Sequence, residues 1–400
     1  MKVLVLNCGS SSLKFRIYQM DREELLAGGL VERIGFDDAR MIYRPVGRES
    51  LEKTLPVKDH EKAIDLVLKT LIHPDTGILG NILEIEAVGH RVVHGGEEFT
   101  GSVAINEAVL ERIKACVKFA PLHNPPNIKG IQASFWLIPF ARQVAVFDTA
   151  FHQTMGPEAF IYGLPYEWYK VHRIRRYGFH GTSHQFVAHK AAEILEKPFK
   201  SLKIITCHLG NGSSITAVRH GESVDTTMGF TPLEGLVMGT RCGDIDPAIP
   251  LHRMEEDQLT PSQMDALLNK KSGLAGITGG DNDLRTIEEK AAKGSERHQL
   301  ALEVFTRRIK KYIGAYAAVM GGIDALVFTA GIGENSDTVR RMVCEGLEFL
   351  GIEMNETANR NHKTRISDGK TSVLVIPTNE ELAIAEEVIE VLERENQLVK

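Results

Sequence analysis

Two turns rich in glycine, asparagine and serine have the composition of a phosphate-binding site. The first reads Asn7-Cys-Gly-Ser-Ser-Ser12 and the second reads Gly210-Asn-Gly-Ser-Ser214. Glycine lets the backbone approach a ligand closely, and serine hydroxyl groups add hydrogen-bond donors for an anion. Each turn lies between two short apolar runs, which predicts the tip of a β-hairpin. An ordinary hairpin turn explains one copy equally well, but the repetition favours a binding role.

Two arginines lie beside glycines, where the backbone is flexible. The first, Arg91, begins the segment Arg91-Val-Val-His-Gly-Gly96, and the second, Arg241, lies within the segment Gly239-Thr-Arg241-Cys-Gly-Asp244. A guanidinium group can hold a carboxylate or a phosphate with two parallel hydrogen bonds. The competing interpretation for either residue is a surface arginine near a turn.

An aspartate and a histidine complete the candidate chemical groups. Asp148 follows an expected strand at 143–147, at the edge where open α/β sheets bind ligands; a turn or helix cap is its alternative role. His180 and His184 are four residues apart, as metal ligands on a helix can be, but no third ligand lies near them in the sequence. We therefore interpret His180 as a positioned hydrogen-bond donor.

Other nucleotide-binding motifs are weak or missing. Gly331-Ile-Gly333 follows an expected strand, but Ser336 stands where a dinucleotide fingerprint has its third glycine. The sequence has no P-loop of the form Gly-x-x-x-x-Gly-Lys-Ser/Thr, and no His-Arg-Asp or Asp-Phe-Gly set of a protein kinase. If phosphate binds, the two hairpin tips are expected to bind it.

The elements that position these residues alternate between strands and helices. Strands are expected at 2–6, 13–18, within 24–57, and at 86–93, 143–147, 204–206, 215–218, 325–328 and 373–376. Helices are expected at 60–72 and 106–119, up to 137, at 299–320 and after 379. A further helix, opened by the segment 178–183 with Thr182 or Ser183 as N-cap, is expected to run through 195. A long loop, 226–250, carries Arg241. The pattern predicts two related α/β lobes, each presenting a hairpin tip to a shared cleft.

Composition limits the class of protein. A chain of 400 residues is long enough for two domains, and its 43% hydrophobic and 25% charged residues are typical of a globular protein. The net charge of −6 argues against nucleic-acid and membrane-surface partners. Five scattered cysteines without a Cys-x-x-Cys pair, and apolar runs too short for a signal peptide or a membrane span, predict a cytoplasmic protein.

Seven motifs together resemble the acetokinase family, the acetate kinases, over the whole chain. They are Asn7-Cys-Gly-Ser-Ser-Ser-Leu-Lys-Phe15, Gly89-His-Arg-Val-Val-His-Gly-Gly96, Val146-Phe-Asp-Thr-Ala-Phe-His152, Tyr177-Gly-Phe-His-Gly-Thr-Ser-His184, His208-Leu-Gly-Asn-Gly-Ser213, Met228-Gly-Phe-Thr-Pro-Leu-Glu-Gly-Leu-Val-Met-Gly-Thr-Arg241 and Pro377-Thr-Asn-Glu-Glu381.

The resemblance implies a fold, a reaction and an assembly. The fold is α/β, with two duplicated βββαβαβα domains of the actin and Hsp70 type and the active site in the interdomain cleft. The N-terminal lobe is expected to comprise 1–149 with 382–400, and the nucleotide-binding lobe 150–381. The implied reaction is the reversible transfer of the γ-phosphoryl group of ATP to acetate, giving ADP and acetyl phosphate. Mg²⁺, with Mn²⁺ as a substitute, and a homodimer are implied as well.

The resemblance also implies a role for each site residue. Asp148, His180 and Arg241 are implied to be catalytic, and Asn7 and Glu380 to lie at the metal site. The implied substrate-binding residues are Lys14, Arg91, Val93, Leu122, Phe179 and Pro232. The implied nucleotide-binding residues are His208, Leu209, Gly210, Asn211, Gly212, Asp283, Leu284, Arg285, Gly331, Ile332, Gly333, Glu334 and Asn335.

Three alternatives stay open on the sequence. Propionate and butyrate kinases of the same family would share these motifs. A sugar or glycerol kinase on the same fold would use Asp148 as a general base and would need a polar acceptor pocket. An ATP-driven switch or filament protein of the Hsp70 or actin kind would need an additional domain or insertions, to which no residues can be assigned.

Overall fold

The chain forms two compact units. The computed structural model describes residues 1–398. The N-terminal unit comprises Met1–Ala150 and the segment that begins at Asn379, and the C-terminal unit comprises Phe151–Thr378. The sequence-based boundaries lie between 149 and 150 and between 381 and 382. The structure thus assigns Ala150 and residues 379–381 to the N-terminal unit, which places Glu380 there as well.

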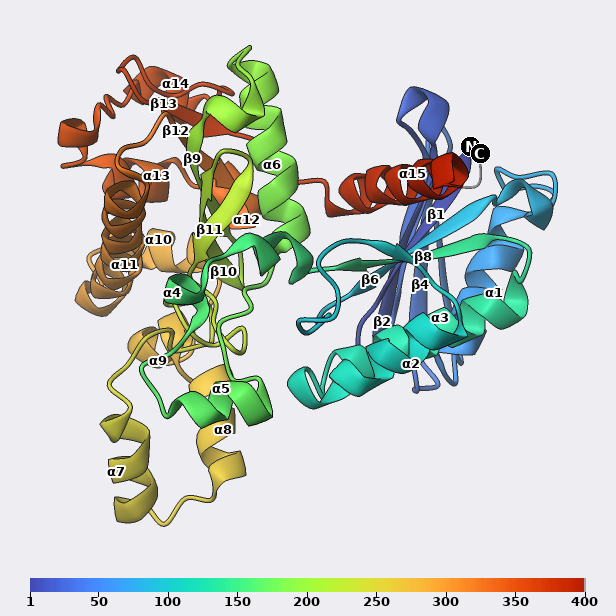
Figure 1. Ribbon diagram of the computed structural model, residues 1–400, viewed down its shortest axis with the longest axis horizontal. Helices are drawn as coiled ribbons and strands as arrows, with labels where there is room; N and C mark the ends of the chain where they lie inside the picture. The colour runs from blue at the N-terminus through green and yellow to red at the C-terminus, as the bar shows by residue number, and fades with distance from the viewer. Residues whose placement is uncertain (399–400) are drawn as a thin grey trace. The chain divides into compact units, whose positions relative to one another are not determined.

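The N-terminal unit is built on one mixed sheet, shown in Figure 1. Its strand order is β5-β4-β3-β2-β1-β6-β8-β7, and β1, β6 and β8 are parallel. The strands are β1 (Lys2–Cys8), β2 (Ser12–Gln19), β3 (Glu24–Glu32), β4 (Ala39–Pro45), β5 (Leu51–Leu55), β6 (Ala87–Val92), β7 (Val103–Ala104) and β8 (Arg142–Phe147). The expected meander within 24–57 is therefore β3 to β5.

Alternating side chains of β1 face two different cores. Leu4 and Leu6 belong to the core that contains α1 (His60–Leu71), whereas Val3 and Val5 belong to the core that contains α15 (Glu380–Leu398). Successive residues of a strand point to opposite faces, so a strand covered on both faces is apolar throughout. The helices α2 (Glu107–Ala115) and α3 (Asn124–Leu137) lie on the side of α1, as Figure 1 shows.

The C-terminal unit is built on a second sheet, of order β11-β10-β9-β12-β13. Its strands are β9 (Lys203–Leu209), β10 (Ser213–Arg219), β11 (Glu222–Thr226), β12 (Ala325–Thr329) and β13 (Ser372–Val375). Ile205 and Cys207 of β9 pack with the long helix α11 (Glu296–Met320) on one face. On the other face, Thr206 and His208 bond to side chains of α6 (Gly181–Ile194).

The two sheets repeat one topology, which confirms the duplicated α/β fold. In each unit the order of the five shared strands is third, second, first, fourth, fifth: β3-β2-β1-β6-β8 and β11-β10-β9-β12-β13. In each, the first strand pairs antiparallel with the second and parallel with the fourth. Both predicted turns are therefore the tips of equivalent hairpins, β1–β2 and β9–β10.

Some local expectations differ from the structure. The N-cap of α6 is His180, with φ of 57°, and not Thr182 or Ser183. The region 149–177, which the sequence predicts to be irregular, contains the short helices α4 (Pro157–Phe160) and α5 (Tyr166–His172). The remaining helices are α7 (Ala248–Glu256), α8 (Pro261–Lys270), α9 (Gly273–Thr278), α10 (Leu284–Ala292), α12 (Ala330–Asn335), α13 (Asp337–Cys344) and α14 (Glu356–Arg360).

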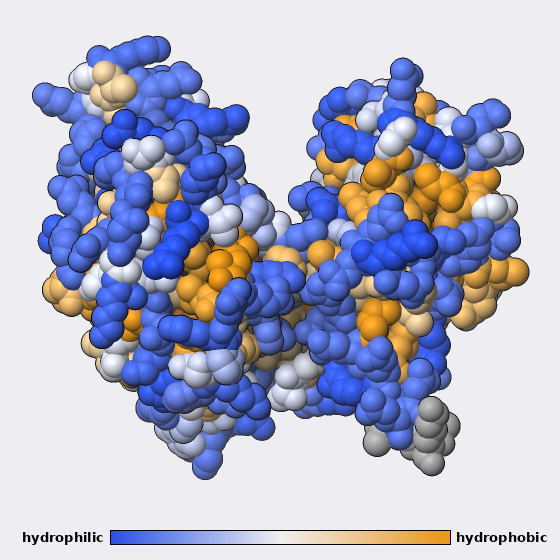
Figure 2. All heavy atoms as spheres, turned by 90° about the horizontal axis from the view of Figure 1, so that it is seen from above, coloured by the Kyte–Doolittle hydropathy of each residue, from blue (hydrophilic) through white to orange (hydrophobic). Residues whose placement is uncertain are grey.

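One face of the molecule is mainly polar (Figure 2). Figure 2 shows one face on which hydrophilic residues predominate and apolar residues gather in separate patches. Within residues 1–398, we find no helix that combines the length and the apolar character needed to cross a bilayer.

Substitution of Gly89 tests the packing of α15 on the N-terminal sheet. A Cβ atom at Gly89 would lie 2.7 Å from Ile384 Cγ2 and 2.9 Å from Val388 Cγ2. We expect Gly89→Ala to lower the free energy of unfolding by about 1–3 kcal/mol, because overpacking forces neighbours to move. Gly101→Ala is the matched control, since a Cβ there meets no atom within 4 Å. Equal melting temperatures for the two variants would contradict this packing.

Candidate active site

The N-terminal unit collects seven of the predicted site residues, which we call the N-terminal half-site. They are Asn7, Lys14, Arg91, Val93, Leu122, Asp148 and Glu380. At the hairpin tip, Asn7 of β1 pairs directly with Lys14 of β2. Directly opposed residues of antiparallel strands present their side chains on the same face. The hairpin therefore places an amide beside an exposed ammonium group.

Arg91 and Asp148 form a bidentate ion pair at the carboxyl edge of the sheet. Arg91 belongs to β6, and Asp148 directly follows the parallel neighbour β8. The Nε of Arg91 donates to Oδ1 of Asp148 at 2.9 Å, and Nη2 donates to Oδ2 at 2.7 Å. Asp148 is buried and both its oxygens are occupied, so it holds Arg91 in one orientation and leaves Nη1 for another acceptor.

Burial and nearby charges act together on this pair. Burial raises the pKa of Asp148, the charge of Arg91 opposes that rise, and the charge of Glu380 adds to it. Burial alone would lower the pKa of Arg91, but the charges of Asp148 and Glu380 outweigh it and leave that pKa raised. Arg91 is therefore a fixed cation with three acidic groups, Asp148, Glu380 and Glu381, within electrostatic reach.

The two predicted apolar residues of this half-site, Val93 and Leu122, have different surroundings. Val93 directly follows β6 and is half-buried, and its N–H donates to Oδ1 of Asn127 at 3.1 Å. Leu122 lies in the turn before α3 with 71% of its surface exposed. The position of Val93 is thus fixed by a hydrogen bond of its backbone, whereas a role for Leu122 in a pocket depends on the resemblance alone.

The donor set fits a magnesium ion that arrives with a nucleotide. Within the described part of the chain, no three His, Cys, Asp or Glu side chains form a group that could hold a metal. Asn7 and Glu380 offer an amide and a carboxylate oxygen. Mg²⁺ keeps several waters and is usually bound through one or two carboxylates together with substrate phosphates. Two oxygen ligands from the protein therefore suffice for such an ion.

The C-terminal unit collects the other predicted residues, which we call the C-terminal half-site. Its first member, His180, begins α6 with its Nδ1 2.8 Å from Oγ of Ser214. The same hydroxyl lies 2.7 Å from Nε2 of His184, and the ring of His180 stacks on His208 with centroids 4.2 Å apart. Burial, together with His152 and His208, lowers the pKa of His184 far below its usual range. The four-residue spacing of His180 and His184 thus serves a hydrogen-bonded network.

Three predicted features meet at the β9–β10 tip. A Cβ atom at Gly212 would lie 3.3 Å from Nη1 of Arg241 and 3.7 Å from Nε2 of His180. The bare backbone of Gly212 therefore lies directly beside both side chains. A phosphoryl group at this tip would meet a guanidinium, an imidazole and backbone amides together.

Arg241 is a half-buried cation without an acidic partner. Its Nη1 donates to the carbonyl of Pro232 at 3.3 Å and lies 3.6 Å from Sδ of Met238. None of the ion pairs found within residues 1–398 includes Arg241, and burial lowers its pKa with no carboxylate to oppose the effect. A desolvated arginine of this kind favours an incoming anion. The same contact brings the predicted pocket residue Pro232 beside Arg241.

A pocket of about 510 Å³ lies between α10 and α12, within the size range of small-ligand sites. Its lining residues are Asp283, Leu284, Arg285, Glu288, Gly331, Ile332, Asn335 and Ser336. Six of these eight are predicted nucleotide-binding residues. The residues 208–212 are not among them and lie at the end of β9 and the hairpin tip, and Gly333 and Glu334 of α12 do not line the pocket either, so only part of the predicted set shares it.

Sequence reasoning missed Glu288 and Ser336 of this pocket. The Ser336 hydroxyl donates to Oε1 of Glu288 at 2.5 Å. Burial raises the pKa of Glu288, and the hydrogen bond from Ser336 opposes that rise. Glu288 lies four residues after Leu284 on a helix, so helical spacing could have indicated it.

Sequence reasoning also missed Arg340, which supports the predicted loop 331–335. Its buried Nη1 donates to the carbonyls of Gly333 and Glu334, each at 2.8 Å. Its Nε donates to Oδ1 of Asn359 at 2.8 Å. A single guanidinium thus satisfies carbonyl groups at the end of α12 and links them to α14.

The fold and the two half-sites define a class of protein. The protein consists of two duplicated α/β units. The N-terminal unit carries an arginine–aspartate pair at a sheet edge. The C-terminal unit carries a pocket of about 510 Å³ and a hairpin tip with Arg241 beside it. Phosphoryl transfer needs such positioned positive charge more than it needs covalent chemistry. The class is that of the kinases.

Comparison with known proteins gives the family. The sequence model of the acetokinase family matches residues 2–386. The acetate kinase of Carboxydothermus hydrogenoformans is 58% identical over 396 residues, 98% of this chain and 99% of that protein. The crystal structure of Porphyromonas gingivalis acetate kinase is 45% identical with a TM-score of 0.95, covering 98% of this chain and 99% of that one. This chain therefore belongs to the acetokinase family.

A second solved structure, a propionate kinase from Francisella tularensis, is 43% identical with a TM-score of 0.91, covering 96% of this chain and 98% of that one. The comparisons confirm the predicted family, the fold and the reaction class, a phosphotransferase with a carboxyl group as acceptor. The roles of individual residues stay predictions.

Substitution of Gly331 tests the pocket. Gly331 lines it, and a Cβ there meets no atom within 4 Å. We expect Gly331→Leu to raise the KM for ATP at least about tenfold while kcat and the KM for the acceptor change little, because the added side chain competes for the space of the nucleotide. Gly314→Leu, on α11, is the control, since its Cβ also meets no neighbour. An unchanged KM for ATP would remove the pocket from the nucleotide site.

Proposed function

We propose that this protein transfers the γ-phosphoryl group of ATP to acetate, giving ADP and acetyl phosphate, and that it catalyses the reverse reaction as well. The observation that carries the proposal is the meeting of Arg241 and His180 beside the backbone of Gly212. The choice of acetate is supported by relatives named acetate kinase at 53–58% identity over nearly the whole chain.

The chemical step exchanges one P–O bond for another. A carboxylate oxygen of acetate forms a bond to the γ-phosphorus while the bond from that phosphorus to the bridging oxygen breaks, and ADP keeps the electron pair. Charge then spreads over the three equatorial oxygens of the transferring group. Arg241 and His180 are proposed to donate hydrogen bonds to these oxygens, and Arg91, held by Asp148, to orient the acceptor carboxylate.

A carboxylate acceptor needs no general base. Carboxyl groups have a pKa of about 4, so acetate is ionised at neutral pH. Both oxygens of Asp148 already accept hydrogen bonds from Arg91, which suits a positioning role. A sugar kinase would need this carboxylate to accept a proton from a hydroxyl group, so the ion pair favours the acid acceptor.

The metal, the compartment and the assembly belong to the proposal too. Asn7 and Glu380 would hold Mg²⁺, which neutralises phosphate charge when it is bound.

Five free cysteines, four of them buried, support a reducing compartment such as the cytoplasm. A homodimer is supported by apolar side chains exposed on α5 and α7 of the C-terminal unit, among them Trp168, Val171 and Leu251.

The direct test measures ADP formation with acetate, propionate, butyrate and glycerol in parallel, with hydroxylamine to trap the acyl phosphate. We expect kcat/KM to be highest with acetate, acyl hydroxamate to form from the acids, and glycerol to be inactive. Because a hydroxyl acceptor yields no acyl phosphate, ATP consumption with glycerol and no hydroxamate would overturn the proposal.

Trimming Val93 tests the selectivity for acetate. Val93 follows Arg91 by two residues, directly after the end of β6, and we propose that both side chains face the acceptor. If Arg91 holds the carboxylate, Val93 faces the methyl group, and Val93→Ala makes room for one more carbon. We expect the propionate-to-acetate ratio of kcat/KM to rise roughly tenfold, since a methylene is worth about 1–3 kcal/mol in an apolar pocket. A lower melting temperature with an unchanged ratio would show that Val93 is only a packing residue.

A further inference from the structure

The loop that carries Pro232 and Arg241 is held by polar contacts outside the reaction centre. We propose that Arg176, Glu234 and Tyr162, which we call the loop clamp, form a positioning unit that sets Arg241 and His180 relative to each other. The proposal rests on the function proposed above, because it concerns the rate of the same phosphoryl transfer. None of the three residues is among the predicted site residues.

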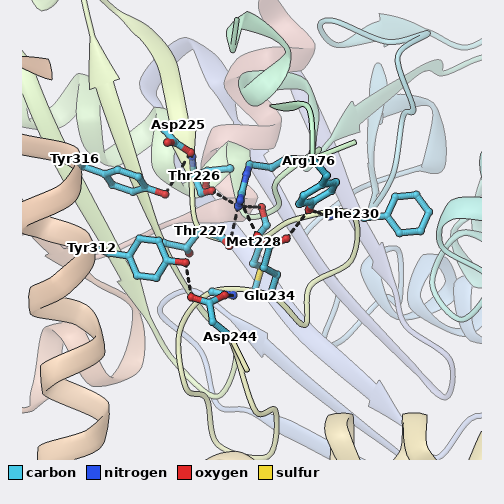
Figure 3. Close-up of polar contacts among 12 residues, drawn as sticks. Arg176, Asp225, Thr226, Thr227, Met228, Phe230, Glu234, Asp244, Tyr312 and Tyr316 are labelled. Atoms are coloured by element: carbon cyan, nitrogen blue, oxygen red, sulfur yellow. Dashed lines mark hydrogen bonds and ion pairs between the residues drawn. The ribbon is translucent and has the colours of Figure 1, made fainter. Parts of the chain in front are cut away.

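Arg176 connects the end of β11 to the loop, as Figure 3 shows. Its Nη1 donates to the carbonyls of Thr226 and Thr227 at 2.8 and 3.1 Å, and its Nη2 donates to Oε1 of Glu234 at 2.6 Å. Burial would lower the pKa of Arg176, but the charge of Glu234 outweighs it and leaves that pKa raised. The guanidinium is therefore a permanent cross-link between strand and loop.

Tyr162 completes the clamp from a different segment, between α4 and α5. Its hydroxyl donates to Oε2 of Glu234 and accepts from the N–H of Phe230 at 2.8 Å. Burial and the charge of Glu234 raise the pKa of Tyr162, so the hydroxyl stays a neutral donor. A Cβ atom at Gly229 would overlap both Oε2 of Glu234 and this hydroxyl, so the clamp closes around a residue without a side chain.

The clamp also reaches the segment that carries His180. The carbonyl of Gly229 accepts hydrogen bonds from the N–H groups of Tyr177 and Gly178, at 3.1 and 3.3 Å. His180 follows Gly178 by two residues. Arg241 and His180, whose side chains meet at Gly212, therefore belong to two segments that are hydrogen-bonded to each other at the carbonyl of Gly229. Loosening the clamp is expected to change the separation of these two side chains.

The far end of the loop is fastened separately. Oδ1 of Asp244 accepts from the N–H of Gly235 at 2.8 Å, and Oδ2 accepts from the hydroxyl of Tyr312 at 2.6 Å (Figure 3). Arg308 donates to the carbonyl of Gly235 at 2.9 Å. Loss of the clamp should therefore leave the loop attached at Gly235 and Asp244, and displace mainly the part near Pro232.

A second tyrosine provides a matched control. Tyr316 lies near the same cluster in Figure 3, and its hydroxyl contacts Oδ1 of Asp225 at 3.5 Å. Asp225 belongs to β11, outside the loop. Tyr162→Phe and Tyr316→Phe thus remove the same atom, from a half-buried tyrosine in the first case and from a buried one in the second, but only the first removes contacts to the loop.

The test compares the two variants in ATP-dependent phosphorylation of acetate. We expect Tyr162→Phe to lower kcat about tenfold and to change the KM for ATP less than about twofold, because small displacements of a positioned group are costly in rate. Tyr316→Phe should change both less than about twofold. Equal loss of kcat in both variants, or no loss in Tyr162→Phe, would overturn the proposal.

A double-mutant cycle shows whether the clamp acts through Arg241. In the Arg241→Ala background, Tyr162→Phe should lower kcat no further, whereas a general structural defect would lower it again by the same factor. If Tyr162→Phe does not fold, as judged by its melting curve, Glu234→Gln is compared with Arg241→Ala in the same way. Wild-type enzyme without activity on any carboxylic acid would instead refute the proposed function.

Discussion

The C-terminal half-site depends on a positive charge that has no acidic partner within residues 1–398. Arg241 is half-buried, and its protein contacts in the described structure are a carbonyl and a thioether. Removing such a charge from water is unfavourable unless an anion replaces the lost hydration. Arg91 has the opposite arrangement, because both oxygens of Asp148 already bind it. One arginine is thus preorganised by a carboxylate, and the other, which we propose to bind the transferring phosphoryl group, is held in place by its loop.

Duplication of the fold explains where these groups lie. In both units the first hairpin tip and the ends of the fourth and fifth strands lie at corresponding positions. The chemistry at these positions has diverged: β6 carries Arg91 near its end, whereas β12 leads into α12, which lines the pocket. In the proposed function, the same frame supplies a cation for the acceptor in one unit and space for the nucleotide in the other.

The sequence allowed most of the fold and the family to be predicted, because their signals are local, whereas the roles of the site residues stay predictions. Apolar runs on both sides of a glycine-rich turn identify each hairpin, and the motifs identify the family. The clamp had no such signal, because Arg176 and Glu234 are 58 residues apart in the sequence. The hydrogen bond between Ser336 and Glu288 in the pocket likewise joins residues that are 48 apart. The incorrect N-cap prediction has a local cause, since Thr182 and Ser183 are typical capping residues but the left-handed backbone of His180 begins the helix.

The position of Pro232 connects selectivity to rate. Its carbonyl accepts the hydrogen bond that orients Arg241, and its ring is the predicted wall of the acyl pocket. A displacement that enlarges the pocket at Pro232 therefore also moves an acceptor of Arg241. Val93 has no such connection to Arg241. Val93 belongs to the N-terminal unit, where its backbone N–H donates to Asn127 of the same unit. A substitution that shortens Val93 should thus raise the activity on longer acids with little loss of kcat. A substitution of Pro232 that enlarges the pocket should raise that activity too, but should also lower kcat.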